Sequence, residues 1–242
     1  MMNKATTLNS SFDMPKITIS NGTIEGLKWL ALLLMTGDHV NKYLFNETLP
    51  GLFEAGRLAM PIFVFVLAYN LARPGLLERG GFKRAIIKLA VCGVISTVPF
   101  IALGSLYDGW YPLNIFFTLL ALTTTIYFIE RGHTVLAGLI FLNMGAFVEY
   151  WWAAIIFGLA IWLYIKKPSV ISAVIAIASC ISFFFINENF WAMAAIPVLL
   201  AAPLIDLKVP RLKWAFYAYY PLHLCALWLI RIPMSNAGYL FF

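Results

Sequence analysis

The sequence predicts an all-α membrane protein, a polytopic transmembrane helical bundle of about nine spans. Of its 242 residues, 62% are hydrophobic and 12% are charged, and the mean hydropathy is +0.85. A soluble domain carries about 25% charged residues, so this chain has almost no soluble part. A spanning helix needs roughly 20 apolar residues, so about nine spans and their short loops use the whole length.

The predicted spans follow one another with short polar, Gly- or Pro-containing connections. A polar segment, 1–22, precedes them and has no apolar signal-peptide region, so residues 23–242 form one predicted transmembrane domain. Several spans contain proline, which membrane helices tolerate when neighbouring helices satisfy the freed backbone groups. The fifth and sixth spans are short, and their boundary is weakly marked. In chain order, the spans are about 24–44, 57–72, 86–106, 111–129, 134–148, 150–165, 169–187, 190–205 and 214–232.

The loops predict the orientation of the bundle. When the N-terminal segment and alternate loops are assigned to one side, that side holds 14 of the 17 Lys and Arg residues. Positively charged loop residues stay in the cytoplasm, so the predicted N-terminal segment is cytoplasmic and the number of spans is odd. The basic residues mostly flank apolar spans. The net charge of +6 therefore does not point to nucleic acid as a partner.

Asp38 and His39 are the strongest functional candidates, near the outer end of the first span in GLKWLALLLMTGDHVNKYL. Ionisable residues inside a membrane segment usually face a protein interior or a water-filled cavity. A carboxylate can fix the tautomer of an imidazole, which suits a general base or an acyl-accepting nucleophile. Adjacent helical residues point about 100° apart, so Asp38 either orients His39 indirectly or holds another group. The structural alternative is an Asp38–Lys42 pair, with His39 at the membrane interface.

Four further polar residues are candidates because they lie near the outer end or the middle of other spans. Arg57 can clamp a phosphate or carboxylate with its rigid fork, or instead snorkel or pair with Glu54. Asn114 can offer its amide to an oxyanion, or form an interhelical hydrogen bond. Glu149 lies among interfacial aromatic residues, and His223 is either a proton-transfer group or a core histidine. With the pair in the first span, these residues are expected to converge on one outward cavity.

Several catalytic motifs are missing from the sequence. It contains no H-E-x-x-H, G-x-S-x-G, Walker or dinucleotide-binding pattern, so an intramembrane zinc protease and an ATP-driven pump lack support. Its three cysteines, Cys92, Cys180 and Cys225, lie far apart in apolar stretches and show neither metal-ligand nor disulfide spacing. No metal site is therefore expected.

Four sequence stretches resemble the TraX family when they are taken together. They are DHVN at the end of the first span, AGRLAMPIFVFVLAYNLAR through the second, LNIFF in the fourth and FYAYYPLHL in the last. The resemblance runs from about residue 22 to residue 232, and its specificity comes from the order and spacing of the motifs. Glu149 has no matching motif position. The other five candidates have one: Asp38, His39, Arg57, Asn114 and His223.

The resemblance implies a multi-pass acetyltransferase of the bacterial inner membrane. The best-known role of the family is amino-terminal acetylation of pilin in conjugative pilus systems, with acetyl-CoA drawn from the cytoplasm as the donor. His39 would act as general base or transient acyl carrier, with Asp38 fixing its protonation. Arg57 and Asn114 would hold the acyl carrier or stabilise the oxyanion. His223 would assist proton transfer, and the acceptor would be reached at the outer half of the bilayer.

Two other functions would use the same residues. A proton-coupled small-solute transporter would employ the buried Asp, His and Arg as a relay, although no internal repeat supports an inverted-repeat transporter. A non-catalytic assembly factor would hold pilin or another membrane partner. The basic loop from Arg73 to Lys88 is a topology signal that is also able to attract anionic membrane lipid or the phosphates of a cytoplasmic cofactor. Dependence on acetyl-CoA separates the enzyme from the other two functions.

Overall fold

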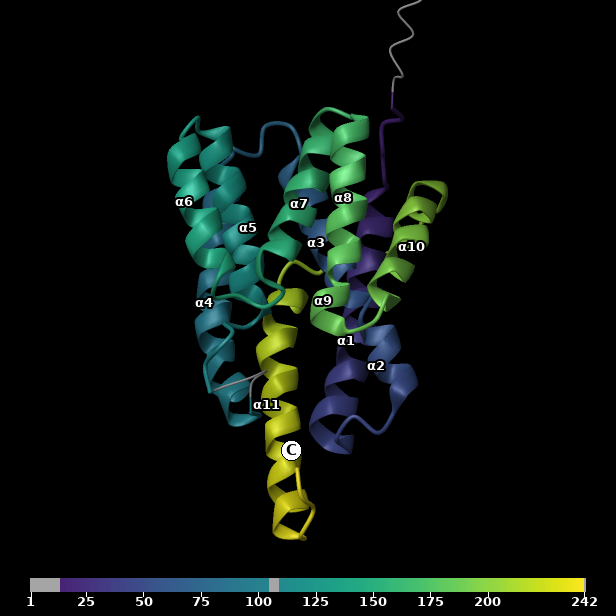
Figure 1. The fold of residues 1–242 in the computed structure, drawn as a ribbon, viewed down its shortest axis with the longest axis vertical. Coiled ribbons are helices and arrows are strands. Elements are labelled where there is room, and N and C mark those ends of the chain that lie inside the picture. Colours follow the sequence, from purple (N-terminus) through teal and green to yellow (C-terminus); the bar gives the residue numbers. More distant parts are fainter. Residues whose placement is uncertain (1–13, 105–108, 242) are drawn as a thin grey trace, which may run out of the picture.

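The computed structural model describes residues 14–104 and 109–241, and over this part the chain is a bundle of helices without a β-strand (Figure 1). The all-α prediction is therefore confirmed. The helices are α1 (Asn21–Phe45), α2 (Pro50–Gly56), α3 (Ala59–Leu71), α4 (Gly81–Ala102), α5 (Ile115–Glu130), α6 (Thr134–Gly145), α7 (Trp151–Lys166), α8 (Val170–Ser182), α9 (Phe184–Asn187), η1 (Trp191–Ala194), α10 (Ala195–Ala201), η2 (Ala202–Leu204) and α11 (Ala215–Asn236).

A helix lies in each of the nine predicted apolar segments. Within the described part of the chain, three helical stretches are long and apolar enough to cross a membrane, namely Pro50–Leu71, Gly81–Ala102 and Val170–Asn187. These stretches indicate a membrane protein. The number of crossings and the cytoplasmic N-terminus stay predictions.

Two segments differ in detail from the sequence prediction. The second helical stretch begins at Pro50 and is interrupted by a turn at Arg57 and Leu58, whereas the predicted span begins at 57. Proline is favoured at the first position of a helix, which explains the early start of α2. The eighth predicted span is three short consecutive pieces, η1, α10 and η2, rather than one helix. Of the predicted polar segment 1–22, residues 1–13 lie outside the described residues.

The helices pack around two clusters of buried apolar side chains. The larger cluster is centred on α3 and α7, and the smaller one joins α1, α4 and α11. Gly158 of α7 faces Leu122 of α5 and Val64 of α3 so closely that an added Cβ atom would overlap both side chains. Small residues of this kind allow membrane helices to approach one another. The close packing fixes α3, which begins directly after the turn at Arg57.

A loop, residues 205–214, crosses the start of α1 before α11 begins. The Thr23 hydroxyl donates a hydrogen bond to the Ile205 carbonyl oxygen at 2.6 Å and accepts one from the Leu207 N–H at 3.1 Å. A Cβ atom on Gly22 would overlap the Leu207 carbonyl oxygen, so glycine is required at this close approach. These contacts fix the loop beside the end of the bundle where α4 also begins.

Candidate functional site

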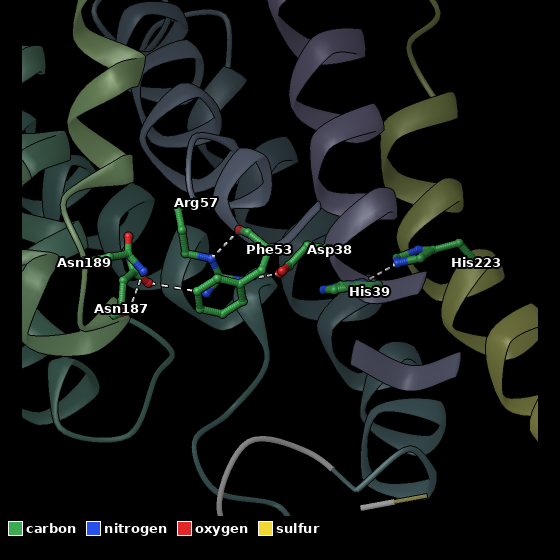
Figure 2. A network of polar contacts seen from close by, with 7 residues as sticks. All are labelled: Asp38, His39, Phe53, Arg57, Asn187, Asn189 and His223. Atoms are coloured by element: carbon green, nitrogen blue, oxygen red, sulfur yellow. Dashed lines mark hydrogen bonds and ion pairs between the residues drawn. The ribbon is translucent and has the colours of Figure 1, made fainter. Parts of the chain in front are cut away.

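Two histidines from helices at opposite ends of the sequence meet in the bundle. His39 Nδ1 lies 2.8 Å from His223 Nε2, and the planes of the two rings are nearly parallel, at an angle of 11° (Figure 2). One turn earlier, Thr36 and Tyr219 hydroxyls form a second bond between α1 and α11, at 2.8 Å. The aligned pairs hold the two helices in register, so the histidine contact belongs to a fixed interface.

The backbone around His223 determines which nitrogen carries each proton. His223 Nδ1 lies 3.1 Å from the Tyr219 carbonyl oxygen, which can only accept a hydrogen bond, so Nδ1 carries the proton. In a neutral ring, Nε2 of His223 is then an acceptor, and Nδ1 of His39 must be the donor across the 2.8 Å contact. Neutral His39 is left with a lone pair on Nε2. Among the described residues, no group forms a hydrogen bond with that atom.

Asp38 points to the other side of α1 and forms an ion pair with Arg57 (Figure 2). Both side chains are mostly buried, with 14% of Asp38 and 15% of Arg57 exposed. The other two guanidinium nitrogens of Arg57 also donate hydrogen bonds. Nε donates to the Phe53 carbonyl oxygen at 3.2 Å, and Nη1 donates to Asn187 Oδ1 at 3.4 Å. The guanidinium also lies over the Phe53 ring, 4.3 Å from its centre. Arg57 therefore ties α1 to α2 and to the end of α9.

The ion pair depends on a close approach between α1 and α2. A Cβ atom on Gly56 would overlap the Asp38 side chain, so only glycine lets the end of α2 lie against α1 at this point. The carboxylate of Asp38 is bound by Arg57 and not by His39, which corrects the expectation that Asp38 fixes the protonation of the histidine. The physical reason is helical geometry, since neighbouring residues diverge by about 100°. Arg57 likewise pairs with Asp38 and not with Glu54.

Asn114 is separate from both contacts and caps a helix. Its side-chain oxygen accepts a hydrogen bond from the Phe116 N–H at 3.2 Å, and its amide nitrogen donates to the Gly93 carbonyl oxygen at 3.0 Å and to the Thr97 hydroxyl at 3.3 Å. Both amide atoms are therefore used between α4 and α5. The six candidates do not converge on one outward cavity, because this side chain is engaged elsewhere.

Replacing Asn114 with alanine is expected to destabilise the protein by about 1–2 kcal/mol, because an N-cap and an interhelical bond are lost together. Unfolding in mixed micelles with increasing SDS measures the change. Asn143→Ala is the matched control, since Asn143 is exposed and its side-chain amide donates to the Leu139 carbonyl oxygen of its own helix. Equal effects of the two substitutions would show that the cap has no special role.

Glu149 lies in the turn between α6 and α7, outside the helices. Its N–H donates to the Leu113 carbonyl oxygen at 3.0 Å, and its own carbonyl oxygen accepts from the Thr118 hydroxyl at 2.8 Å. Burial raises the pKa of its carboxyl group to about 8, against the smaller lowering effect of the Lys42 and Arg57 charges. The raised pKa favours the neutral acid, which reduces the negative charge near Arg57.

A cavity of about 450 Å³ opens between α1, α3, α4, α5 and α11. The lining residues farthest along α1 and α11 from the basic end are Met35 and Tyr220. The Tyr220 ring packs edge-on against His223 at 5.3 Å and against His39 at 6.2 Å between ring centres. The cavity therefore ends at an aromatic ring that touches both histidines. Among the described residues that line it, seven are basic and none is acidic: Lys28, Arg73, Arg79, Arg84, Lys88, Arg211 and Lys213.

A family model described as TraX protein matches residues 23–231. The chain belongs to the TraX family. The matched range contains all six candidate residues and both partners of the histidine contact. No curated protein and no solved structure matches the chain.

Two residues of this TraX-family site escape prediction from the sequence. Asn187 binds Arg57 across 130 positions of sequence, and Tyr219 acts on His223 through its backbone carbonyl group. Asn187 lies at the end of an apolar helix, where a polar residue is ordinary. A backbone acceptor carries no side-chain signal at all. Only the folded TraX-family chain reveals these two partners.

Proposed function

We propose that the protein is a membrane-embedded acetyltransferase that moves an acetyl group from acetyl-CoA to an amine or hydroxyl group. By the family resemblance, the acceptor is the amino terminus of pilin or a similar envelope acceptor. The observation that carries the proposal is the hydrogen-bond chain from the Tyr219 carbonyl group through His223 to His39. It leaves a basic nitrogen without a hydrogen-bond partner among the described residues, on a ring that packs against Tyr220 at the end of the cavity.

In the proposed reaction, His39 Nε2 takes a proton from the acceptor as the acceptor nitrogen or oxygen attacks the thioester carbonyl carbon. The new bond to carbon forms, the carbon–sulfur bond breaks, and the leaving thiolate takes the proton from Nε2. Protonation makes His39 positive, and His223 Nε2 stabilises that charge by accepting the hydrogen bond from His39 Nδ1. His223 is thus a positioning residue. The same lone pair would carry the acetyl group if a covalent intermediate forms.

Arg57 and Asp38 have a supporting role in this proposal. Each of the three guanidinium nitrogens of Arg57 already has a partner, so in this proposal the ion pair fixes the segment of α1 that carries His39 rather than clamping the donor. Asn114 supports α5, whose residues Ile115 and Phe116 line the cavity. In this proposal, neither Arg57 nor Asn114 stabilises the oxyanion.

The direct test uses purified protein in nanodiscs with acetyl-CoA labelled in the acetyl group, and a short peptide with a free amino terminus as acceptor. Transfer of label to the peptide, with one free CoA thiol for each acetyl group moved, supports the proposal. A parallel reaction with an amino-terminally blocked peptide is the control for the acceptor. If neither CoA nor labelled peptide forms above the rate without protein, even with crude envelope acceptors, the acetyltransferase proposal fails and proton-coupled transport takes its place.

A further inference from the structure

We propose that the basic mouth of the cavity binds the phosphate groups of a nucleotide-bearing thioester carrier, while the carrier's arm lies along the apolar part towards His39. This inference rests on the proposed acetyl transfer and names where its donor binds. It assigns the site to Arg73, Arg79, Arg84 and Lys88, together with the loop of residues 205–214 that carries Arg211 and Lys213.

The charge of the mouth has little compensation within the protein. Among the described residues, only Lys28 and Arg211 of the seven cations that line the cavity form an ion pair, and both use the same Glu25 oxygen, at 2.7 Å and 3.9 Å. The other five have no carboxylate partner there. Clustered like charges destabilise a folded protein unless an anion neutralises them, and a concave surface focuses their field. The arginine forks among them match the geometry of phosphate oxygens.

The depth of the cavity fits a ligand with a long, mostly apolar arm. Along α1, the lining runs from Lys28 to Met35, a rise of about 10 Å at 1.5 Å per residue, and His39 lies about 6 Å farther along the helix. Between these ends the lining turns from basic to aromatic and aliphatic, with Phe63, Phe116 and Tyr220. An extended phosphopantetheine arm spans a comparable length. Phosphates at the mouth therefore place a thioester beside the histidine contact.

The loop before α11 completes the mouth from outside the helices. Its anchor at Thr23 and Gly22 brings Arg211 and Lys213 to the cavity edge. Lys88 of α4 packs over the Trp214 ring at 4.2 Å and over the Tyr217 ring at 5.3 Å, which joins the other side of the mouth to the same loop. Cations from α1, the segment between α3 and α4, α4 and this loop thus surround one opening. A single lipid phosphodiester would neutralise only one of them.

The test is binding of adenosine 3′,5′-bisphosphate, which has phosphates but no thioester, to the protein in phosphatidylcholine nanodiscs. We expect the bisphosphate to bind and to compete with acetyl-CoA. We also expect KM to rise about tenfold or more for the acetyl thioester of dephospho-CoA, and further for acetylpantetheine, at similar kcat. Arg79→Gln and Arg84→Gln should weaken bisphosphate binding by about tenfold each. Both residues are exposed, so the variants should fold.

Arg131→Gln is the matched control, since Arg131 is an exposed arginine that does not line the cavity. Its bisphosphate affinity should equal that of the wild type. If acetyl-CoA and acetylpantetheine react equally well and the bisphosphate does not bind, the phosphate site is wrong while acetyl transfer stands. If the bisphosphate binds at the arginines but no acetyl group moves, the site stands and the proposed function fails. If phosphatidylglycerol nanodiscs abolish bisphosphate binding, the mouth is a lipid site and the inference is overturned.

Discussion

Replacement of His39 by alanine is expected to lower the rate of acetyl transfer about 100- to 10,000-fold, the range in which general base catalysis contributes. The substitution removes the imidazole whose Nε2 stays without a hydrogen bond in the contact from Tyr219 through His223 to His39. The rate of CoA release in nanodiscs measures the loss. Because the side chain also packs on Tyr43 and Tyr220, a melting curve must show that the variant is folded.

Two further variants make this result specific. His133→Ala removes an exposed histidine at the start of α6 and should leave the rate unchanged. His223→Phe keeps an aromatic ring near Tyr219 but removes the acceptor for His39 Nδ1. Because the base itself remains, the rate should fall less than with His39→Ala. The pH dependence of the rate should shift, because His39 loses the partner that stabilises its charged form. Activity in His39→Ala equal to that of the wild type would exclude His39 as base and as acyl carrier.

Breaking the Asp38–Arg57 ion pair is expected to destabilise the protein by about 3–5 kcal/mol, because Arg57→Ala leaves a mostly buried carboxylate without its partner. The double variant Asp38→Asn/Arg57→Gln should recover part of this loss, since no unpaired charge remains. SDS-induced unfolding in mixed micelles measures both. Activity should fall with stability, because the pair fixes the segment of α1 that carries His39.

A surface ion pair in the same molecule provides the comparison. Lys166 and Glu130 lie 2.7 Å apart, but 41% of the Lys166 side chain is exposed. Lys166→Ala should therefore cost no more than about 1 kcal/mol. If Arg57→Ala costs as little as Lys166→Ala, the pair between α1 and α2 has no special structural role.

The positions of the helices could be predicted from the sequence because hydropathy is a local property. Each of the nine apolar segments holds helix, and the motif order correctly indicates the TraX family. The break at Arg57 and the fragmented segment from Trp191 to Leu204 could not be predicted in the same way. Both depend on turns and on packing against neighbouring helices. A hydropathy value averaged over many residues does not resolve such local breaks.

For the site, the sequence gives depth along a helix but not direction around it. Asp38 and His39 are correctly singled out as unusual, yet their partners could not be predicted, since that requires the rotation of α1 relative to α2 and α11. Arg57 and His223 lie on opposite sides of α1, so the adjacent residues belong to two different contacts. Asn114 combines both cases, because its cap follows from a local rule, whereas its bonds to α4 depend on how the helices pack.

The histidine contact joins residues 184 positions apart, on α1 and α11. During synthesis, α1 leaves the ribosome long before α11, so His39 enters the membrane without the partner that fixes its tautomer. In the proposed mechanism, full reactivity of His39 therefore requires α11 to have docked against α1. A partly made chain would lack this contact, so the timing of biogenesis itself would limit the chemistry until α11 is in place.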